Sequence, residues 1–318
     1  MSSPATCVWH EKHRERRIRM GDKFAIVVDG TACLTPELER EFDIRLLPLH
    51  VDIGKETFTA RVDLSDDEFY RKIAAPGVLT GTSTPSLGET REVYDSILKE
   101  GTKQILVLVI ATELSTTYSV AETTAQAAAA ATGTRIEVID TRSLAGGIAL
   151  IATAVGRLRR NGGSFDEAVA LAKKMAGTIP LLAVADTLEY LKRSGRVSGA
   201  QALFGSMLQV KPILDVKDGV VLPIDRVRTR DKAIARMKEI VLERLPAGSR
   251  IHACTLHTNE PNRARDLTAW VQEQFHCVEH WTAEAGAVIG ARAGPGVVGL
   301  CWYREENSPV SDDGRRIK

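Results

Sequence analysis

The sequence predicts an α/β protein of two domains: an N-terminal parallel-sheet α/β/α sandwich, then a C-terminal domain with a mixed or antiparallel sheet and helices. β-Branched runs at Phe24–Asp29, Ile105–Ile110 and Arg135–Asp140 alternate with helical stretches, which is typical of a parallel sheet covered on both faces. Beyond about residue 180 the pattern changes, and Asp218-Gly219 between two apolar runs indicates an antiparallel hairpin. The length of 318 residues suits two such domains.

The domain boundaries follow from the same change of pattern. We place the N-terminal α/β domain at residues 23–180 and the C-terminal α+β domain at residues 181–306. Residues 1–20 carry five basic and two acidic side chains, a net charge of +3, and have no apolar run long enough for a signal peptide. We expect residues 1–22 to be a disordered arm or sequence upstream of the native start, and the polar residues 307–318 to be a frayed tail.

Individual elements are predicted from capping residues and periodicity. Ser65 is an expected N-cap, and Gly133 ends an alanine-rich helix. The expected helices are 66–74, 85–99, 118–131, 145–160, 165–177, 231–245 and 261–275, and the later strands are 251–256 and 296–303.

Composition excludes several classes of function. Lys and Arg number 42 against 41 Asp and Glu, so the formal net charge of +1 gives no reason to expect binding to nucleic acid or to a membrane surface. The five cysteines are widely spaced without a C-x-x-C pair, so neither a disulfide framework nor a zinc site is indicated. This usage predicts a reducing, cytoplasmic location, and Cys254 and Cys301 are expected to be core residues.

Two hydroxyl-rich segments are the first candidate site. Gly81-Thr-Ser-Thr-Pro-Ser86 is read as a loop entering a helix, and Ala111-Thr-Glu-Leu-Ser-Thr-Thr-Tyr118 directly follows a buried strand. Loops beyond the carboxyl ends of parallel strands form a ligand crevice, and helix N-termini there favour anions. We therefore predict a carboxylate or phosphate cradle, with ordinary helix capping as the alternative.

A glycine-rich segment, Gly290-Ala-Arg-Ala-Gly-Pro-Gly296-Val-Val-Gly299, is the second candidate. Residues 294–299 match G-x-G-x-x-G formally, but a strand-like run follows instead of a helix, so we reject a dinucleotide site. We expect a Gly-Pro-Gly turn that presents Arg292, whose guanidinium suits an oxyanion. The alternative is a tight turn with an exposed arginine.

A basic cluster and a lone histidine complete the candidates. Lys192, Arg193 and Arg196 lie at an expected helix end, where cations favour the dipole, or else they meet a phosphate or an acidic partner. His257 follows a strand and lines the crevice or is structural. No histidine has metal-ligand spacing, and no metal or cofactor is predicted.

The ordered motifs resemble those of the DegV family of bacterial fatty-acid-binding proteins, from about Phe24 to Arg304. Asp29-Gly-Thr-Ala-Cys-Leu34 is similar to the family's D-S-T-A-D-L, and Thr82-Ser-Thr-Pro-Ser86 to its T-S-x-P-S. Further matches are Leu114-Ser-Thr-Thr-Tyr118 to L-S-G-T-Y, Val138-Ile-Asp140 to V-I-D, Leu191-Lys-Arg-Ser-Gly-Arg196 to L-K-x-G-G-R, and Gly290–Gly299 to G-x-H-x-G-P-G-x-x-G.

The resemblance implies a two-domain, non-catalytic carrier that holds one long-chain fatty acid in a tunnel between its domains. It implies that Thr82, Ser83, Ser115 and Arg292 bind the carboxylate. In firmicutes some members present the acid to an ATP-dependent fatty-acid kinase. Separately, we expect Lys192, Arg193 and Arg196 to be partner-facing. The secondary candidates near the head group are Asp29, Thr31, Thr116, His257, Asn259 and Gly294.

Three positions depart from the family pattern. Gly30 replaces a serine and Thr116 replaces a glycine. Arg292, which carries a permanent charge, replaces a histidine. An enzyme remains the alternative: a phosphotransferase or hydrolase acting on a small anionic substrate in the same cradle, with His257 or Asp140 as base. A regulator that docks a partner through its basic face is a third reading.

Overall fold

A computed structural model describes residues 24–75, 77–197 and 210–307. The expected arm at 1–22 and all but the first residue of the expected tail at 307–318 lie outside the described residues. No helix in the described ranges has the length and hydrophobicity to cross a bilayer.

The predicted parallel sheet is present, with strand order β2-β1-β6-β7. All three pairings are parallel, and Ile26 lies opposite both Ile44 and Leu106. The short strand β2 was not expected from the sequence. The strands are β1 (Ala25–Asp29), β2 (Ile44–Leu47), β6 (Gln104–Val109) and β7 (Arg135–Asp140).

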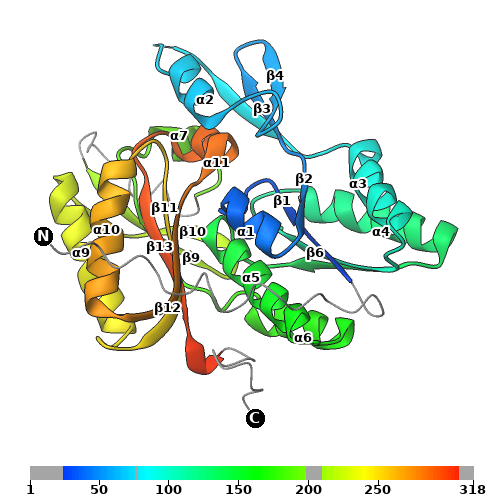
Figure 1. Cartoon of the computed structure of the whole chain (residues 1–318). Coiled ribbons are helices and arrows are strands. Elements are labelled where there is room, and N and C mark those ends of the chain that lie inside the picture. Colours follow the sequence, from blue (N-terminus) through cyan, green and yellow to red (C-terminus); the bar gives the residue numbers. More distant parts are fainter. Residues whose placement is uncertain (1–23, 76, 198–209, 308–318) are drawn as a thin grey trace, which may run out of the picture.

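Helices cover both faces of this sheet (Figure 1). Tyr94 and Ala121 from α3 and α4 pack on one face, while α5 and α6 pack on the other. Ser86 forms a capping box with Glu89, so α3 starts at Leu87 and the expected start at Pro85 is wrong by two residues. These helices are α3 (Leu87–Lys99), α4 (Thr117–Thr132), α5 (Gly146–Arg160) and α6 (Phe165–Met175).

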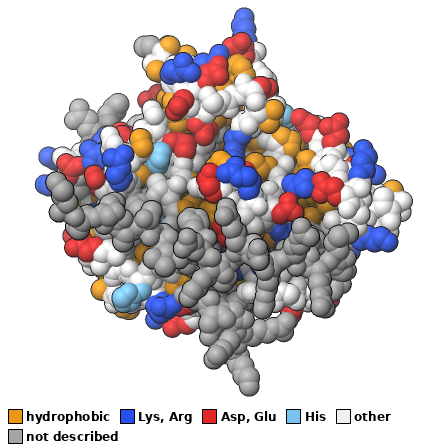
Figure 2. Space-filling view, viewed as in Figure 1, with side chains coloured by type: hydrophobic (Ala, Val, Ile, Leu, Met, Phe, Trp, Pro, Cys, Tyr) orange, Lys and Arg blue, Asp and Glu red, His pale blue; other side chains and the backbone are white. Residues whose placement is uncertain are grey.

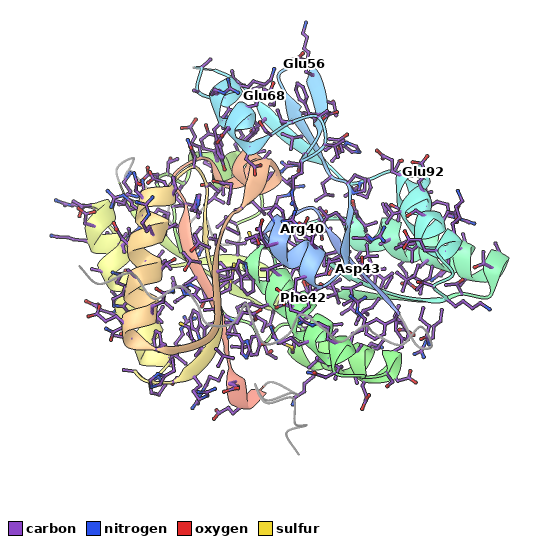
Figure 3. The ribbon with its side chains drawn as sticks, viewed as in Figure 1. Arg40, Phe42, Asp43, Glu56, Glu68 and Glu92 are labelled. Carbon is purple, nitrogen blue, oxygen red and sulfur yellow. The ribbon has the colours of Figure 1, made fainter. Side chains whose placement is uncertain are left out.

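The short helix α1 (Pro36–Glu41) leads into Phe42, which Figure 3 labels between α1 and α5. A Cβ at Gly156 of α5 would lie only 2.6 Å from Cδ1 of Phe42. The absence of a side chain at Gly156 therefore lets the Phe42 ring enter the core.

The second sheet has six strands in the order β10-β9-β8-β13-β11-β12. Its β9–β10 hairpin at Asp218-Gly219 confirms that prediction, and β11 pairs with β12 in parallel, so the sheet is mixed. Helices α9 (Arg230–Arg244) and α10 (Pro261–Gln274) pack against it. The strands are β8 (Leu181–Val184), β9 (Lys211–Lys217), β10 (Val220–Val227), β11 (Arg250–His257), β12 (His276–Glu284) and β13 (Val298–Arg304), and the 3-10 helix η2 (Glu305–Asn307) follows.

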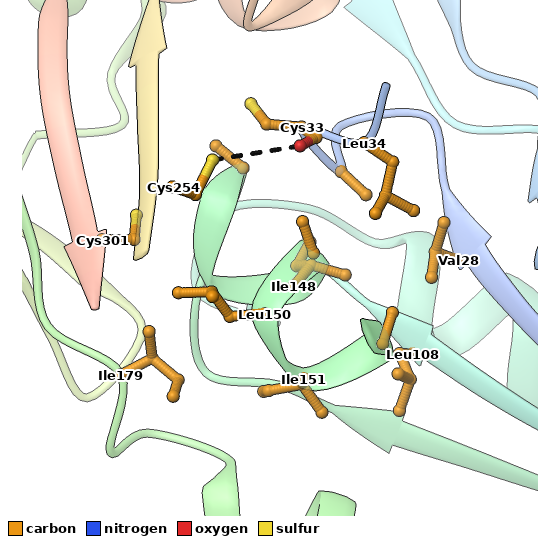
Figure 4. Packing of buried hydrophobic residues seen from close by; sticks show 14 of the residues in the cluster. Val28, Cys33, Leu34, Leu108, Ile148, Leu150, Ile151, Ile179, Cys254 and Cys301 are labelled. Carbon is orange, nitrogen blue, oxygen red and sulfur yellow. Dashed lines mark hydrogen bonds between the residues drawn. The ribbon is translucent and has the colours of Figure 1, made fainter. Parts of the chain in front are cut away.

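Helix α5 also contacts β11 and β13, so it packs between the two large sheets. The buried side chains of Ile148, Leu150 and Ile151 join those of Cys254 and Cys301 in one cluster (Figure 4). A Cβ at Gly146 would lie 2.8 Å from Sγ of Cys301, so the start of α5 approaches β13 through a glycine. Cys254 and Cys301 are fully buried, as predicted.

A third, antiparallel sheet was not predicted. Its order is β4-β3-β5, and with helix α2 (Asp66–Ile73) it forms a body that we call the covering unit, residues 49–83. It stands above α7 and α11 in Figure 1, and Figure 3 labels Glu56 and Glu68 on it. Because Gly81–Ser83 belong to β5, the expectation that they form a loop is wrong. The strands are β3 (His50–Ile53), β4 (Glu56–Thr59) and β5 (Thr80–Ser83).

A largely buried polar network joins α5 to the six-stranded sheet. Arg157 pairs with Glu279 and donates to the hydroxyl of Tyr303, while Glu279 also contacts His252. Burial raises the pKa of Glu279, but Arg157 and His252 together lower it by more than burial raises it. The pKa of Glu279 therefore lies below its ordinary value.

We predict that Glu279→Gln destabilises the protein at neutral pH by about 3 kcal/mol, because it leaves Arg157 buried without its carboxylate. A carboxylate whose folded pKa is lowered stabilises above its unfolded pKa, and this contribution is lost as pH falls through the folded pKa. Urea unfolding of both proteins at pH 7 and pH 4 should therefore give a smaller difference at pH 4. The exposed change Glu243→Gln is the control, and an equal effect of both variants would contradict the prediction.

Candidate functional site

A cavity of about 600 Å³ lies between the covering unit, the carboxyl ends of β1 and β6, and the C-terminal domain. The C-terminal domain contributes β10 and the helices α7 (Glu189–Ser194) and α11 (Gly286–Ala293). Its lining is largely apolar, with hydroxyls as most of the polar groups. The apolar lining is Leu49, Ile110, Leu114, Leu144, Leu191, Val221, Val288, Ile289 and Ala293; the hydroxyls are Thr31, Thr82, Ser83, Thr84, Thr112, Ser115 and Thr116; Gly195, Glu113, Arg196 and Arg292 complete it.

Arg292 is tied to the covering unit through Thr82. Its Nε donates to Oγ1 of Thr82 at 2.8 Å and its Nη2 donates to the Thr82 carbonyl at 3.0 Å. Since Oγ1 of Thr82 accepts this bond, its own proton remains available for a further acceptor. Burial and the nearby Arg196 lower the pKa of Arg292, although a guanidinium stays charged in proteins.

Arg292 lies in the last turn of α11, before Gly294-Pro295-Gly296. The expectation that the Gly-Pro-Gly turn itself presents this arginine is therefore wrong. The turn ends the helix instead: Gly294 has φ +78°, and a Cβ there would lie 2.4 Å from Cδ2 of Tyr190.

Ser115 and Thr116 are placed by the start of α4. Oγ of Ser115 accepts from the Thr117 N–H at 3.3 Å and lies 2.9 Å from Oγ1 of Thr117. Thr116 occupies the N-cap position with φ −84° and makes no side-chain cap bond. This backbone needs no glycine, so the departure from the family's glycine causes no strain here.

Asp29 positions Thr31 and is itself fully buried. Its carboxylate accepts the backbone N–H groups of Thr31 and Ile110 and the hydroxyl of Thr31. Burial raises the pKa of Asp29 despite these bonds. Asp29 therefore fixes the position of Thr31 at the cavity without lining the cavity itself. The hydroxyl proton of Thr31 is directed to Asp29, so Thr31 offers lone pairs to the cavity.

His257 and Asn259 are not among the cavity-lining residues. Nδ1 of His257 lies 2.9 Å from Oε2 of Glu284, and the Asn259 backbone N–H donates to the same oxygen at 2.9 Å. Asp140 is also outside the lining and accepts from Thr112 and the Arg142 backbone. The two bases named for an enzyme are thus not in this cavity.

The basic cluster divides at the end of α7. Arg196 lines the cavity, while Lys192 and Arg193 are exposed outside it. Arg193 lies over the Tyr190 ring at 4.8 Å. On the face shown in Figure 2, side chains of both charge signs are intermixed over the described residues instead of forming one basic surface.

Sequence reasoning missed several lining residues. Val288 and Ile289 precede Arg292 by three to four positions, which is the spacing of one helix face, so recognition of α11 would have indicated them. Leu49 follows a short strand and carries no comparable signal. Among the described residues, no group of His, Cys, Asp or Glu side chains is arranged to hold a metal ion.

The fold and the cavity define a two-domain α/β protein with a ligand-sized site between its domains. The DegV family model, described as an uncharacterised protein family, matches residues 23–305. The chain belongs to the DegV family.

Relatives and solved structures match this chain over nearly its whole length. A DegV domain-containing protein of Halalkalibacterium halodurans is 32% identical, with 89% of this chain and 99% of the relative covered. One from Streptomyces coelicolor is 34% identical over 88% of this chain and 98% of the relative.

Two structural neighbours are fatty-acid-binding DegV proteins. The one from Thermus thermophilus has a TM-score of 0.81 and 29% identity, covering 88% of this chain and 99% of its own. The one from Bacillus subtilis has a TM-score of 0.77 and 30% identity, covering 89% and 99%.

Proposed function

We propose that this protein binds a long-chain fatty acid in the cavity, with the carboxylate held by Thr82, Ser83, Ser115 and Arg292. The observation that carries the proposal is the Arg292–Thr82 pair, which places a cation and a hydroxyl donor in a largely apolar cavity. The fatty-acid-binding neighbours from Thermus thermophilus and Bacillus subtilis support it.

The energetics suit an acyl ligand. Burial of each CH₂ group is worth about 0.8 kcal/mol, so a C16–C18 chain supplies more than about 10 kcal/mol before ordering costs. The cavity volume of about 600 Å³ lies within the range of roughly 300–1,000 Å³ that is usual for small-molecule sites. The head group then needs only a few fixed donors for orientation.

Arg292 supplies the positive charge that balances the negative charge of the fatty-acid carboxylate. No carboxylate of the described residues lies within 4.0 Å of the Arg292 guanidinium, and its remaining N–H groups suit an ionised carboxylate. Thr31 contributes lone pairs instead of a proton, so we assign it a minor role.

We predict that the purified protein carries a stoichiometric acyl ligand and that Arg292→Ala weakens its affinity for oleate by about 10- to 100-fold, since a charge-assisted hydrogen bond is lost. Denaturing mass spectrometry of extracted lipid and titration with oleate are the measurements. Arg193→Ala removes the same charge outside the cavity and should leave affinity unchanged. Absence of any acyl species together with no uptake of oleate would refute fatty-acid binding.

The arginine also predicts the pH dependence of binding. A guanidinium keeps its charge from pH 6 to pH 9, so the wild-type affinity for ionised oleate should be flat over this range. In Arg292→His the side chain loses its proton above an ordinary pKa of about 6.5, so affinity should fall as pH rises. Parallel decline of both proteins in a pH titration would show that Arg292 does not meet the carboxylate.

We further propose a non-catalytic carrier in the cytoplasm that has the fatty acid as its ligand and no cofactor, and presents the acid to a fatty-acid kinase. Lys192 and Arg193 are exposed on α7 next to the cavity residue Arg196, which is where an acidic partner surface could meet them. The rival reading as a phosphotransferase or hydrolase is weaker, because neither His257 nor Asp140 lines the cavity.

The double change Lys192→Glu and Arg193→Glu should reduce phosphorylation of the bound fatty acid by a fatty-acid kinase at least tenfold, because like charges repel across the interface. Lipid content should stay at the wild-type level. Glu189→Gln, on the same helix, is the control. Unchanged phosphorylation would contradict this docking surface without touching the fatty-acid site.

A further inference from the structure

The covering unit and helix α11 meet along a seam that leads into the cavity. The covering unit belongs by chain to the N-terminal domain, whereas α11 belongs to the C-terminal domain. Thr82 and Ser83 line the cavity from one side of the seam, and Val288 and Arg292 line it from the other. Separation of the two sides would therefore open the cavity wall.

Apolar contact across the seam is made by small side chains on the α11 side. Ala287, Val288 and Ala291 are the α11 members of the covering unit's core cluster. A Cβ at Gly290 would lie 2.7 Å from Oη of Tyr70, so the helix approaches the unit through a glycine. The covering unit contributes the fully buried ring of Phe69, but α11 supplies only small side chains, so this seam is weaker than one with leucine and isoleucine on both sides.

The junction between the two large sheets is a stronger contact. There α5 buries Ile148, Leu150 and Ile151 completely, within the largest aliphatic cluster of the described residues. Opening at that junction would expose much more apolar surface than opening at the seam. Of these two contacts between the domains, the seam is the easier one to separate.

Four polar attachments hold the seam closed, and they run along the length of α11. At the N-terminal end the hydroxyl of Tyr70 donates to Oε1 of Glu284 at 2.9 Å, and the Ala287 N–H donates to Asp66 at 2.9 Å. In the last turn of α11 the Ala291 carbonyl accepts from Thr80 at 2.9 Å. At the cavity end Arg292 donates to Thr82.

Glu284 is the centre of the N-terminal attachment. Its Oε2 accepts the Asn259 backbone N–H and lies 2.9 Å from Nδ1 of His257, which accepts from the Glu260 N–H, while its Oε1 accepts from Tyr70. Burial and the Glu284 charge raise the pKa of Tyr70, which keeps the phenol protonated as a donor. The predicted candidates His257 and Asn259 thus contact the carboxylate of this attachment.

We propose that the covering unit is a gate: the fatty acid enters and leaves when the unit separates from α11, and the Tyr70–Glu284 hydrogen bond is the latch that sets how often this happens. The gate rests on the proposed fatty-acid binding. A latch that is broken in the open state and intact in both the empty and the loaded closed states changes rates without changing equilibrium affinity.

The kinetic test uses Tyr70→Phe, which removes the hydroxyl and keeps the ring. Stopped-flow exchange of a fluorescent long-chain fatty acid should show association and dissociation both about tenfold faster, with Kd unchanged, as expected for loss of a hydrogen bond to a carboxylate. Tyr94→Phe is the matched control, since its buried hydroxyl bonds to Ala121 away from the seam, and it should leave both rates unchanged. Equal rates in Tyr70→Phe and wild type would overturn the latch.

A ligand-free measurement separates the gate from the proposed function. Hydrogen–deuterium exchange of the empty protein should be faster in residues 80–83 and 286–293 than in β11 and β13, and Tyr70→Phe should speed only the former, by about tenfold. Thr80→Val, which removes another bond of the seam, should act in the same direction. Exchange of the seam at the rate of the sheet cores in all variants would refute the gate, whereas absence of fatty-acid binding with a fast seam would refute only the function proposed above.

Discussion

The position of helix α5 between the two large sheets is the constraint on which the rest of the structure depends. A helix that is apolar almost all round is stable only when it is covered on every side. The parallel sheet covers one side of α5 and the six-stranded sheet covers the other. The two domains therefore share one core, and the cavity lies beyond the start of this helix, where Leu144 lines it.

The covering unit follows from the same geometry. Once α5 fixes the two sheets, an opening remains at the carboxyl ends of β1 and β6, and the chain closes it with an excursion of residues 49–83. The excursion packs on α11 of the opposite domain, so each side supplies part of the head-group site. Thr82 and Arg292 meet although 210 positions separate them in the chain.

How much could be predicted depended on the length and pattern of each segment. The strands at Ala25–Asp29 and Arg135–Asp140 are β-branched runs bounded by turns, and both were predicted, as were the long helices with clear caps. In the covering unit the helix after Ser65 was predicted, but the sheet was missed because its strands have four residues each and the segment around Gly81 is rich in glycine and hydroxyl residues, which is typical of loops. The segment Thr80–Ser83 is a strand because it pairs with β3, and no local sequence signal indicates such pairing.

For the site, the kinds of residue were predicted better than their placement. Thr82, Ser83, Ser115 and Arg292 all line one cavity, as do Thr31, Thr116 and Arg196. The sequence could not show that Arg292 lies on a helix, or that His257 is engaged by Glu284, because both depend on contacts with distant segments. Resemblance to a family identified the residues, and only the fold decides which atoms they offer.

The thiol of Cys301 at the start of α5 has a consequence for how the chain is made. The start of α5 has no side-chain cap, and it packs through Gly146 against the sulfur of Cys301, about 155 positions later on β13. During synthesis the first half of the protein leaves the ribosome with its central helix uncovered on one side, because β11 and β13 are made later. The fold is therefore completed only when the final strand emerges, so the two halves are not independent folding units, and a nascent chain that stalls before β13 would expose the apolar face of α5.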